Sequence, residues 1–278
     1  MYEELYKKGA PESEALERLT KIIRVLRGPG GCPWDRAQTH RSLIRGMIEE
    51  AYEVVEAIEA ENPENLKEEL GDVLLQVVMH AQIAEEAGLF SLRDVADEVS
   101  EKMIRRHPHV FEEKTAGNPQ NCGISVDNVV ELWENVKQGE ENESSEAEKM
   151  RRIPKHLPAL LRSEKIQAKA RRAGFDWDDV SKAFLKVREE LRELEEACGE
   201  QNKEHMRHEA GDLLFAAVNV ARFLEIDPEE ALNLTSERFI RRFTYVEDQA
   251  RSTGRSLNSM TLAEMDGLWE LAKSLEKA

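Results

Sequence analysis

Acidic side chains recur in two parts of the chain at a spacing that suits metal binding. Each copy reads E-E-x-x-E, then fifteen residues, then E-x-x-D. Helix positions three apart lie on one face, so the two acids that flank each x-x point the same way. Two antiparallel helices can therefore bring four carboxylates together. The acids are Glu49, Glu50, Glu53, Glu69 and Asp72 in the first copy, and Glu189, Glu190, Glu193, Glu209 and Asp212 in the second.

Four carboxylates converge only where a cation offsets their repulsion. The motifs offer oxygen ligands without Cys or paired His, a set that suits Mg²⁺ or Mn²⁺ and not Zn²⁺. Such a metal can bridge phosphate oxygens and activate a water. The predicted metal ligands are Glu50, Glu53, Glu69 and Asp72 in the first copy, and Glu190, Glu193, Glu209 and Asp212 in the second.

Two other interpretations of the acids compete with this one. Acidic helices often carry E-x-x-E on a solvated face without any metal. A di-iron bundle also uses carboxylates, but it needs E-x-x-H on two helices, whereas Glu69 and Glu209 are followed by Asp at that position. The recurrence of the whole pattern with matched gaps favours a metal site.

The two copies are an internal repeat. At an offset of 140 positions, residues 49–75 align with residues 189–215 without a gap, and 11 of 27 positions are identical. Most of these identities are charged. Duplication of a scaffold alone would retain mainly apolar positions, so the repeat indicates a duplicated site.

Basic and aromatic residues near the second motif predict a phosphate-binding surface. Lys186 and His205 each lie four residues before an acid of the motif, on the same helix face. The first copy has Gly46 and Asn65 there, so its site is poorer in such groups. The other predicted substrate contacts are Arg238, Arg241, Arg242 and Trp269, where the arginines suit a phosphate chain and Trp269 suits a base. Trp133 is the counterpart of Trp269.

The composition favours a soluble helical protein. A formal net charge of -17 repels nucleic acid and anionic membranes, so we expect neither as a partner. Aromatic residues are 6%, and alternating β-branched runs are scarce. Cys32, Cys122 and Cys198 are odd in number and far apart, which indicates reduced thiols and a cytoplasmic location.

Helices must position these motifs. Apolar spacing predicts helices over 16–26, through 54–58 and over 66–81, with Leu70, Leu74 and Val77 in the core stripe of the last. We expect about four helices per domain. A polar stretch that lacks apolar periodicity divides the chain into a first domain, 1–137, a linker, 138–150, and a second domain, 151–278.

Together these motifs resemble those of the MazG-type nucleoside triphosphate pyrophosphohydrolases over nearly the full chain. In the first half the resemblance rests on GCPWD at 31–35, QTH at 38–40, ELGD at 69–72 and RRHPHVF at 105–111. In the second half it rests on KIQ at 165–167, GFDW at 174–177, EAGDLLF at 209–215 and the arginine run at 238–243.

The resemblance implies two tandem all-α domains whose four-helix cores are completed in a homodimer. It also implies Mg²⁺-dependent cleavage of nucleoside triphosphates into a monophosphate and pyrophosphate. Because Lys186 has no counterpart at Gly46, we expect the second domain to be the principal site. Glu189 or Glu190 would assist deprotonation of the attacking water. The family often has Lys where this chain has His205, which puts that phosphate contact in question.

Three questions stay open at this point. The first domain is either a second active site or a duplicated dimerisation and regulatory module. A narrower pyrophosphatase acting on dUTP or a phosphoribosyl nucleotide is one rival function. A helical metal- or nucleotide-binding regulator without catalysis is the other.

Overall fold

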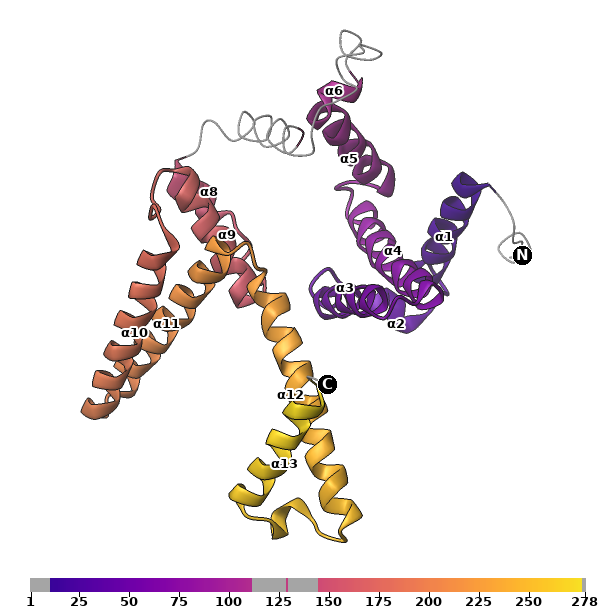
Figure 1. Cartoon of the computed structure of the whole chain (residues 1–278). Coiled ribbons are helices and arrows are strands. Elements are labelled where there is room, and N and C mark those ends of the chain that lie inside the picture. The colour runs from indigo at the N-terminus through magenta and orange to yellow at the C-terminus, as the bar shows by residue number, and fades with distance from the viewer. Residues whose placement is uncertain (1–10, 112–128, 130–144, 277–278) are drawn as a thin grey trace. The chain divides into compact units, whose positions relative to one another are not determined.

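The computed structural model describes residues 11–111, 129 and 145–276. Every regular element in these ranges is a helix (Figure 1), which confirms the all-α class. Cys122, Trp133 and residues 138–144 of the expected linker lie outside the described residues. The chain divides into two compact units, Met1–Glu140 and Glu141–Ala278, and each is considered by itself.

The first unit is built around α4, which packs against α1, α3 and α5. Asn62 begins α4 by accepting a hydrogen bond from the backbone N–H of Asn65, and Pro63 occupies the first turn, where its missing N–H costs nothing. Its helices are α1 (Glu12–Arg27), α2 (Pro33–Ala37), α3 (Ile44–Glu59), α4 (Pro63–Glu86), α5 (Leu92–Arg106) and α6 (Pro108–Phe111).

The core of the first unit is small. Ile23 of α1, Leu43 before α3, and Val78 and Met79 of α4 form its buried cluster. Leu70 and Leu74, which the apolar pattern assigns to the core stripe of α4, are instead 51% and 41% exposed. The acidic half of α4 therefore carries an uncovered apolar face in the single chain.

The second unit contains two helical hairpins (Figure 1). Helices α10 and α11 lie side by side and form the most extensive helix pair, and α12 pairs with α13. Helix α9 packs against both α11 and α12. The elements are α8 (Glu146–Arg151), α9 (Ala159–Arg172), α10 (Val180–Glu200), α11 (Lys203–Phe223), α12 (Pro228–Ser252), η3 (Leu257–Ser259) and α13 (Leu262–Leu275).

The expected helices are present, but the number exceeds the expected four per domain. The described part of the second unit has five helices of 14 or more residues, and short helices occur in both units. Helices α2, α6 and α8 have five, four and six residues, too few for a periodic apolar pattern to be read. Helix α8 begins in the last part of the expected linker, where Ser145 and Glu148 form a capping box, and ends one residue beyond it at Arg151. Among the described residues, no helix has the length and apolar character needed to cross a membrane.

Candidate metal and phosphate site

The α10–α11 hairpin positions the second set of acids. Asp179 begins α10 by accepting from the N–H of Ser181. Helix α10 ends at Glu200 and is followed by Gln201, whose φ of 55° is left-handed. Asn202 then accepts from the N–H groups of Glu204 and His205 to begin α11. A connection of two residues forces the helices to run antiparallel, so an E-x-x-E on one faces an E-x-x-D on the other.

The carboxylates of this hairpin gather in two overlapping groups. Oxygens of Glu190, Glu209 and Asp212 all lie within 4.8 Å of one another, and so do oxygens of Glu189, Glu190 and Glu193. Glu190 belongs to both groups and is only 4% exposed. Because opposite ligands of one Mg²⁺ lie about 4 Å apart, small side-chain rotations bring either group to ligand distances. The donor set therefore fits a hard divalent cation.

Lys186 faces these acids from one turn earlier on α10. Its Nζ lies 3.0 Å from Oε1 of Glu189 and also pairs with Oε1 of Glu190. Hydrogen bonds with Glu190 and then Glu189 raise the pKa of Lys186, so the ammonium stays protonated. Lys186 is thus a permanent cation beside the acids, as a phosphate-binding role requires.

His205 of α11 lies between two acids, Glu200 and Glu209. Its Nε2 lies 3.2 Å from Oε1 of Glu209, and its Nδ1 lies 3.0 Å from Oε2 of Glu200. The hydrogen bond with Glu200 and the nearby charge of Glu209 raise the pKa of His205. These acids favour the imidazolium, so His205 retains part of the cationic character that a lysine would have.

The first unit also gathers its acids, but in a different combination that does not include Asp72. Oxygens of Glu50, Glu53 and Glu69 lie within 4.8 Å of one another. Burial raises the pKa of Glu50, and the negative charges of Asp72 and Glu53 raise it further. Burial, followed by the charge of Glu53, likewise raises the pKa of Glu69. Acids that crowd together without a compensating cation behave in this way.

The two sites differ in what faces the acids. In the first unit Gln76, one turn after Asp72, hydrogen-bonds to Glu50 and so lowers the pKa of that carboxyl in part. A Cβ on Gly46, the counterpart of Lys186, would lie 2.9 Å from Nε2 of Gln76. The neutral amide therefore occupies space that a side chain at position 46 would need. Sequence inspection missed Gln76, although its spacing of four from Asp72 places it on the acidic face.

The predicted arginine cluster lies on the other hairpin. Arg242 of α12 pairs with Glu276 at the end of α13, and its guanidinium lies 5.8 Å from the ring centre of Trp269. Arg242, Arg241 and Arg238 all lower the pKa of Glu276, mainly through the hydrogen bond from Arg242. Arg238 also donates to Oγ1 of Thr235. Glu276 went unnoticed in the sequence, although it follows Trp269 by seven residues, two turns along one helix face.

The single chain does not join the arginines to the acids. In the described part of the second unit, the hydrogen bonds and ion pairs recorded for Arg238 and Arg242 stay within the α12–α13 hairpin. Phe239 packs on Trp269 of the same hairpin with ring centres 4.9 Å apart. A second copy of the chain or a movement of α12 would be needed to unite the two groups.

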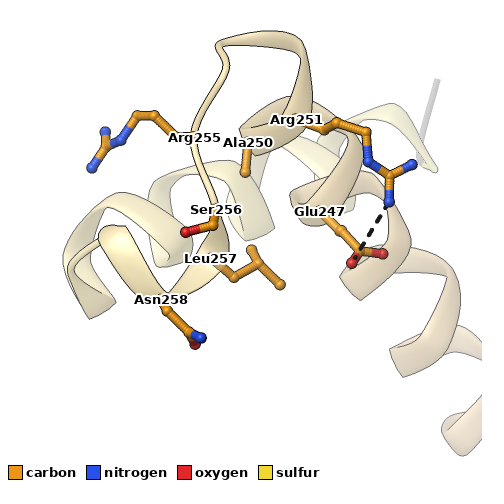
Figure 2. A pocket seen from close by; sticks show the side chains of 7 residues that line it. All are labelled: Glu247, Ala250, Arg251, Arg255, Ser256, Leu257 and Asn258. Carbon is orange, nitrogen blue, oxygen red and sulfur yellow. Dashed lines mark ion pairs between the residues drawn. The ribbon is translucent and has the colours of Figure 1, made fainter.

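A surface pocket on this hairpin is separate from the acids. Figure 2 shows it where α12 ends and η3 begins, with a volume of about 410 Å³. Arg251 lies 3.8 Å from Glu247 at its rim. Arg255 is held by both carboxylate oxygens of Glu264, at 2.7 and 3.2 Å. Arg251 and Arg255, the two cations of this pocket, are therefore already paired with acids. The acids of the E-E-x-x-E and E-x-x-D motifs do not line the pocket.

The fold and the clustered carboxylates define a class of all-helical proteins with paired acidic motifs, and comparison with known proteins gives the family. The MazG nucleotide pyrophosphohydrolase domain matches residues 38–111 and 179–246, which contain both acidic motifs. The chain belongs to this family, as its motifs suggested.

Curated relatives agree with this assignment. The nucleoside triphosphate pyrophosphohydrolase/pyrophosphatase MazG of Thermotoga maritima is 43% identical over 92% of this chain and 95% of its own length. The nucleoside triphosphate pyrophosphohydrolase of Escherichia coli is 39% identical over 94% of this chain and 98% of its own. The uncharacterized protein YabN of Bacillus subtilis is 49% identical over 92% of this chain, which spans 51% of YabN.

Proposed function

We propose that this protein hydrolyses nucleoside triphosphates, both ribo- and deoxyribonucleotides, to a nucleoside monophosphate and pyrophosphate, with Mg²⁺ bound by the acids of the α10–α11 hairpin. The observation that carries the proposal is the position of Glu190, which is buried, shared by two carboxylate groups and paired with Lys186. A buried carboxylate that lies close to several other carboxylates is suited to bind a metal ion. The names of the Thermotoga and Escherichia relatives support the reaction class.

Different residues of the α10–α11 hairpin would bind the metal, accept a proton and neutralise phosphate charge. Glu190, Glu193, Glu209 and Asp212 would hold Mg²⁺, with Mn²⁺ as a substitute. The bound ion would polarise phosphate oxygens and lower the pKa of a water. Glu189 is half exposed beside Lys186 and can accept a proton from the attacking water, as can Glu190. Lys186 and His205 would neutralise charge that develops on the phosphates.

The arginine cluster would hold the distal phosphates. Arg238, Arg241 and Arg242 lie on one stretch of α12 with Trp269 beside them, and a guanidinium fork matches phosphate oxygens. Because this cluster and the acids lie on separate hairpins in one chain, we propose that the working site forms in a homodimer. Exposed apolar side chains such as Leu214, Phe239 and Ile240 give a second copy a surface to cover.

The first unit holds a similar acidic group in which Arg45 pairs with Glu49, but position 46 has a glycine where the second unit has Lys186. We propose that the second unit performs most of the turnover, since Lys186 has no cationic counterpart at Gly46. The first unit would then serve as a weaker site or as a dimerisation and regulatory module. The role in the cell would be removal of unwanted nucleotides from the cytoplasmic pool.

A substrate panel with pyrophosphate detection tests the reaction. The proposal expects steady release of pyrophosphate from several ribo- and deoxyribonucleoside triphosphates at catalytic protein concentration. Turnover confined to dUTP or to a phosphoribosyl nucleotide would show a narrower pyrophosphatase. Nucleotide binding without turnover, measured with Mg²⁺ present, would show a regulator.

A further inference from the structure

Two histidines of the first unit contact each other outside the acidic site. His40 lies in the turn before α3, within the QTH motif to which the proposed function assigns no role, and His80 lies on α4. Their Nδ1 atoms are 2.8 Å apart. The ring planes are within 3° of parallel, and the ring centres are 5.1 Å apart. This is as far apart as the centres can lie at that nitrogen distance, so the two Nδ1 atoms face each other on the line between the rings.

This geometry is that of an N–H···N hydrogen bond. Two lone pairs that meet head on cannot converge on a metal ion, because each metal–nitrogen bond is about 2 Å long and the nitrogens are only 2.8 Å apart. Among the described residues, no acid or cysteine joins the pair as a third metal ligand. One ring therefore donates its Nδ1 proton, and the Nδ1 atom of the other ring accepts it.

The hydrogen bond joins a locally ordered turn to α4. The backbone N–H of Thr39 donates to the hydroxyl oxygen of Ser42 at 2.9 Å, and the N–H of Ser42 donates to the hydroxyl of Thr39 at 3.1 Å. Arg27 of α1 donates to the carbonyl of the residue before Thr39 at 3.2 Å. Leu43, directly after the turn, is buried in the core cluster. His40 therefore holds the middle of this turn on α4.

The position of this turn affects the first acidic group, because α3 begins directly after it. Glu50 lies seven residues beyond Leu43, which is two turns along α3. On α4, His80 lies one turn after Gln76, which hydrogen-bonds to Glu50. The histidine pair thus closes one end of the α3–α4 hairpin. At the offset of 140 positions, the counterpart of His80 is Val220, so the second unit lacks the pair.

The number of bound protons decides whether this bond exists. A neutral pair, or a pair with one added proton, keeps an N–H that faces a bare nitrogen. A second added proton puts an N–H on both Nδ1 atoms, so the acceptor is lost and two positive charges face each other. Burial, followed by the positive charge of His40, lowers the pKa of His80. The folded chain therefore resists the second proton.

Charged groups on the elements around the pair are engaged with one another. Helix α4 packs against α1, α3 and α5. The ion pairs of these helices are Arg24–Glu85 and Arg27–Glu86 between α1 and α4, Arg45–Glu49 on α3 and Arg93–Asp97 on α5. The segment that carries His40 also contains Asp35, Arg36 and Arg41. Of all these groups, His40 is the one whose charge shifts the pKa of His80.

We propose that His40 and His80 form a proton-operated latch on the first unit. While the pair holds no more than one added proton, the latch keeps the turn on α4. When both rings are protonated, the latch opens, and the start of α3 and the acids that follow it lose their alignment with α4. The latch needs no nucleotide and has no equivalent in the second unit, so it stands apart from the proposed reaction.

The sign of the pH dependence follows from His80. Its pKa is lowered in the folded chain, so the unfolded chain binds more protons and stability rises with pH. The stability that the latch contributes is therefore complete above the ordinary pKa of 6.5 and is lost as pH falls through the folded-state value.

NMR of the imidazole nitrogens in the full chain tests the shared proton, as pH falls from about 8 to about 4.5. His40 and His80 should titrate in two linked steps, and His40→Asn should leave His80 a single step at higher pH. An unchanged titration of His80 in His40→Asn would overturn the latch. Loss of both imidazole signals on adding equimolar Zn²⁺ at neutral pH would make the pair a metal site and would also overturn it.

Hydrogen exchange measures release of the turn. The N–H of Met47 donates to the carbonyl of Leu43 in the first turn of α3. After correction for the intrinsic effect of pH, it should exchange about fivefold faster once both rings are protonated, as expected for one lost hydrogen bond. His40→Asn offers an amide that cannot take up a proton, so exchange should no longer respond to pH. His40→Ala should exchange at the faster rate throughout.

His156→Asn changes an exposed histidine of the second unit and is the matched control, so Met47 should keep its wild-type response in that variant. Exchange at Met47 that does not depend on pH in the wild type, or that responds equally in His40→Asn, would show that the histidine pair does not hold the turn.

Discussion

Arg242 directs two N–H groups at a single oxygen of Glu276, with Nε at 2.9 Å and Nη2 at 2.5 Å from Oε2. A phosphate oxygen would take the same fork. Under the proposed function, the Glu276 carboxylate stands where a phosphate would bind, and substrate would have to displace it. The two N–H groups of Arg242 are fixed in direction before substrate arrives.

Removal of Arg242 tests the phosphate clamp. Arg242→Ala should lower kcat/KM for triphosphates by about tenfold to a thousandfold, as expected for the loss of ~1.5–4 kcal/mol of charged contact. Activity on triphosphates should fall more than activity on diphosphates, because a diphosphate lacks the γ group. Steady-state kinetics on both substrates check this. If Arg242 only forms a surface ion pair, worth under about 1 kcal/mol, kinetics will hardly change.

Glu276→Gln is the matched control for that variant. It removes the competing charge and keeps the shape, so KM for triphosphates should stay the same or fall. A loss of kcat/KM similar to that of Arg242→Ala would mean that the ion pair matters for the structure of the hairpin and not for phosphate binding.

Metal dependence follows from the oxygen-only ligand set. Excess EDTA should abolish pyrophosphate release, and added Mg²⁺ or Mn²⁺ should restore it. Because a bound ion stabilises the folded state by mass action, Mg²⁺ should also raise the melting temperature. Glu193→Gln should reduce both effects. Full turnover in metal-free buffer would remove the metal site from the mechanism.

The two acidic sites should contribute unequally. Glu193→Gln keeps the side-chain shape and removes a ligand charge, so it should abolish most turnover. Glu53→Gln makes the same change in the first unit and should have the smaller effect, because Gln76 and Gly46 stand where the second site has a cation. Parallel measurements of kcat for the two variants decide this. Equal losses would mean that both units catalyse alike.

Assembly is tested by light scattering. Exposed apolar residues such as Leu70, Leu74 and Leu214 predict a homodimer at micromolar concentration. Leu214→Glu places a charge on that surface and should weaken the dimer and lower activity together. A monomeric mass for the fully active wild type would contradict the dimer.

The start of α13 should show acid sensitivity. Hydrogen bonds from Arg255 and then from the N–H of Thr261 lower the pKa of Glu264 from its ordinary 4.5 to about 2. A lowered folded-state pKa adds stability above the unfolded-state value, and this stability is lost as pH falls from about 4.5 towards 2. Glu264→Gln should therefore melt earlier than wild type at pH 7, by a margin that shrinks in acid. A margin independent of pH would assign the effect to the capping bond alone.

The acidic hairpins could be predicted because their information is local. Spacing of three within a helix fixes which acids share a face, and the Asn residues at 62 and 202 mark where the second helices begin. A single E-x-x-E is common in acidic helices, but its recurrence with matched gaps in both halves favours a functional site. These features need no knowledge of what packs against the helices.

Contacts between distant segments could not be predicted in the same way. The apolar pattern of α4 assigns Leu70 and Leu74 to a core, but which apolar face is covered depends on neighbours the pattern does not specify. Likewise, spacing places Arg238 and Arg242 on one face of α12 without saying which hairpin that face meets. A surface cavity of the second unit is lined by residues of α9, of the loop before α10 and of α11, and the sequence pattern of one helix does not predict such a convergence.

The connection at Gln201 and Asn202 also affects how the molecule forms. All acids of the second site lie within residues 189–212, so their approach closes only a short loop, and contacts of this kind form early in folding. The repulsion among Glu190, Glu209 and Asp212 is then met on the folding pathway itself. If the proposed divalent cation binds these acids during folding, it would lower the barrier as well as stabilise the product, and the folding rate would then rise with Mg²⁺ concentration.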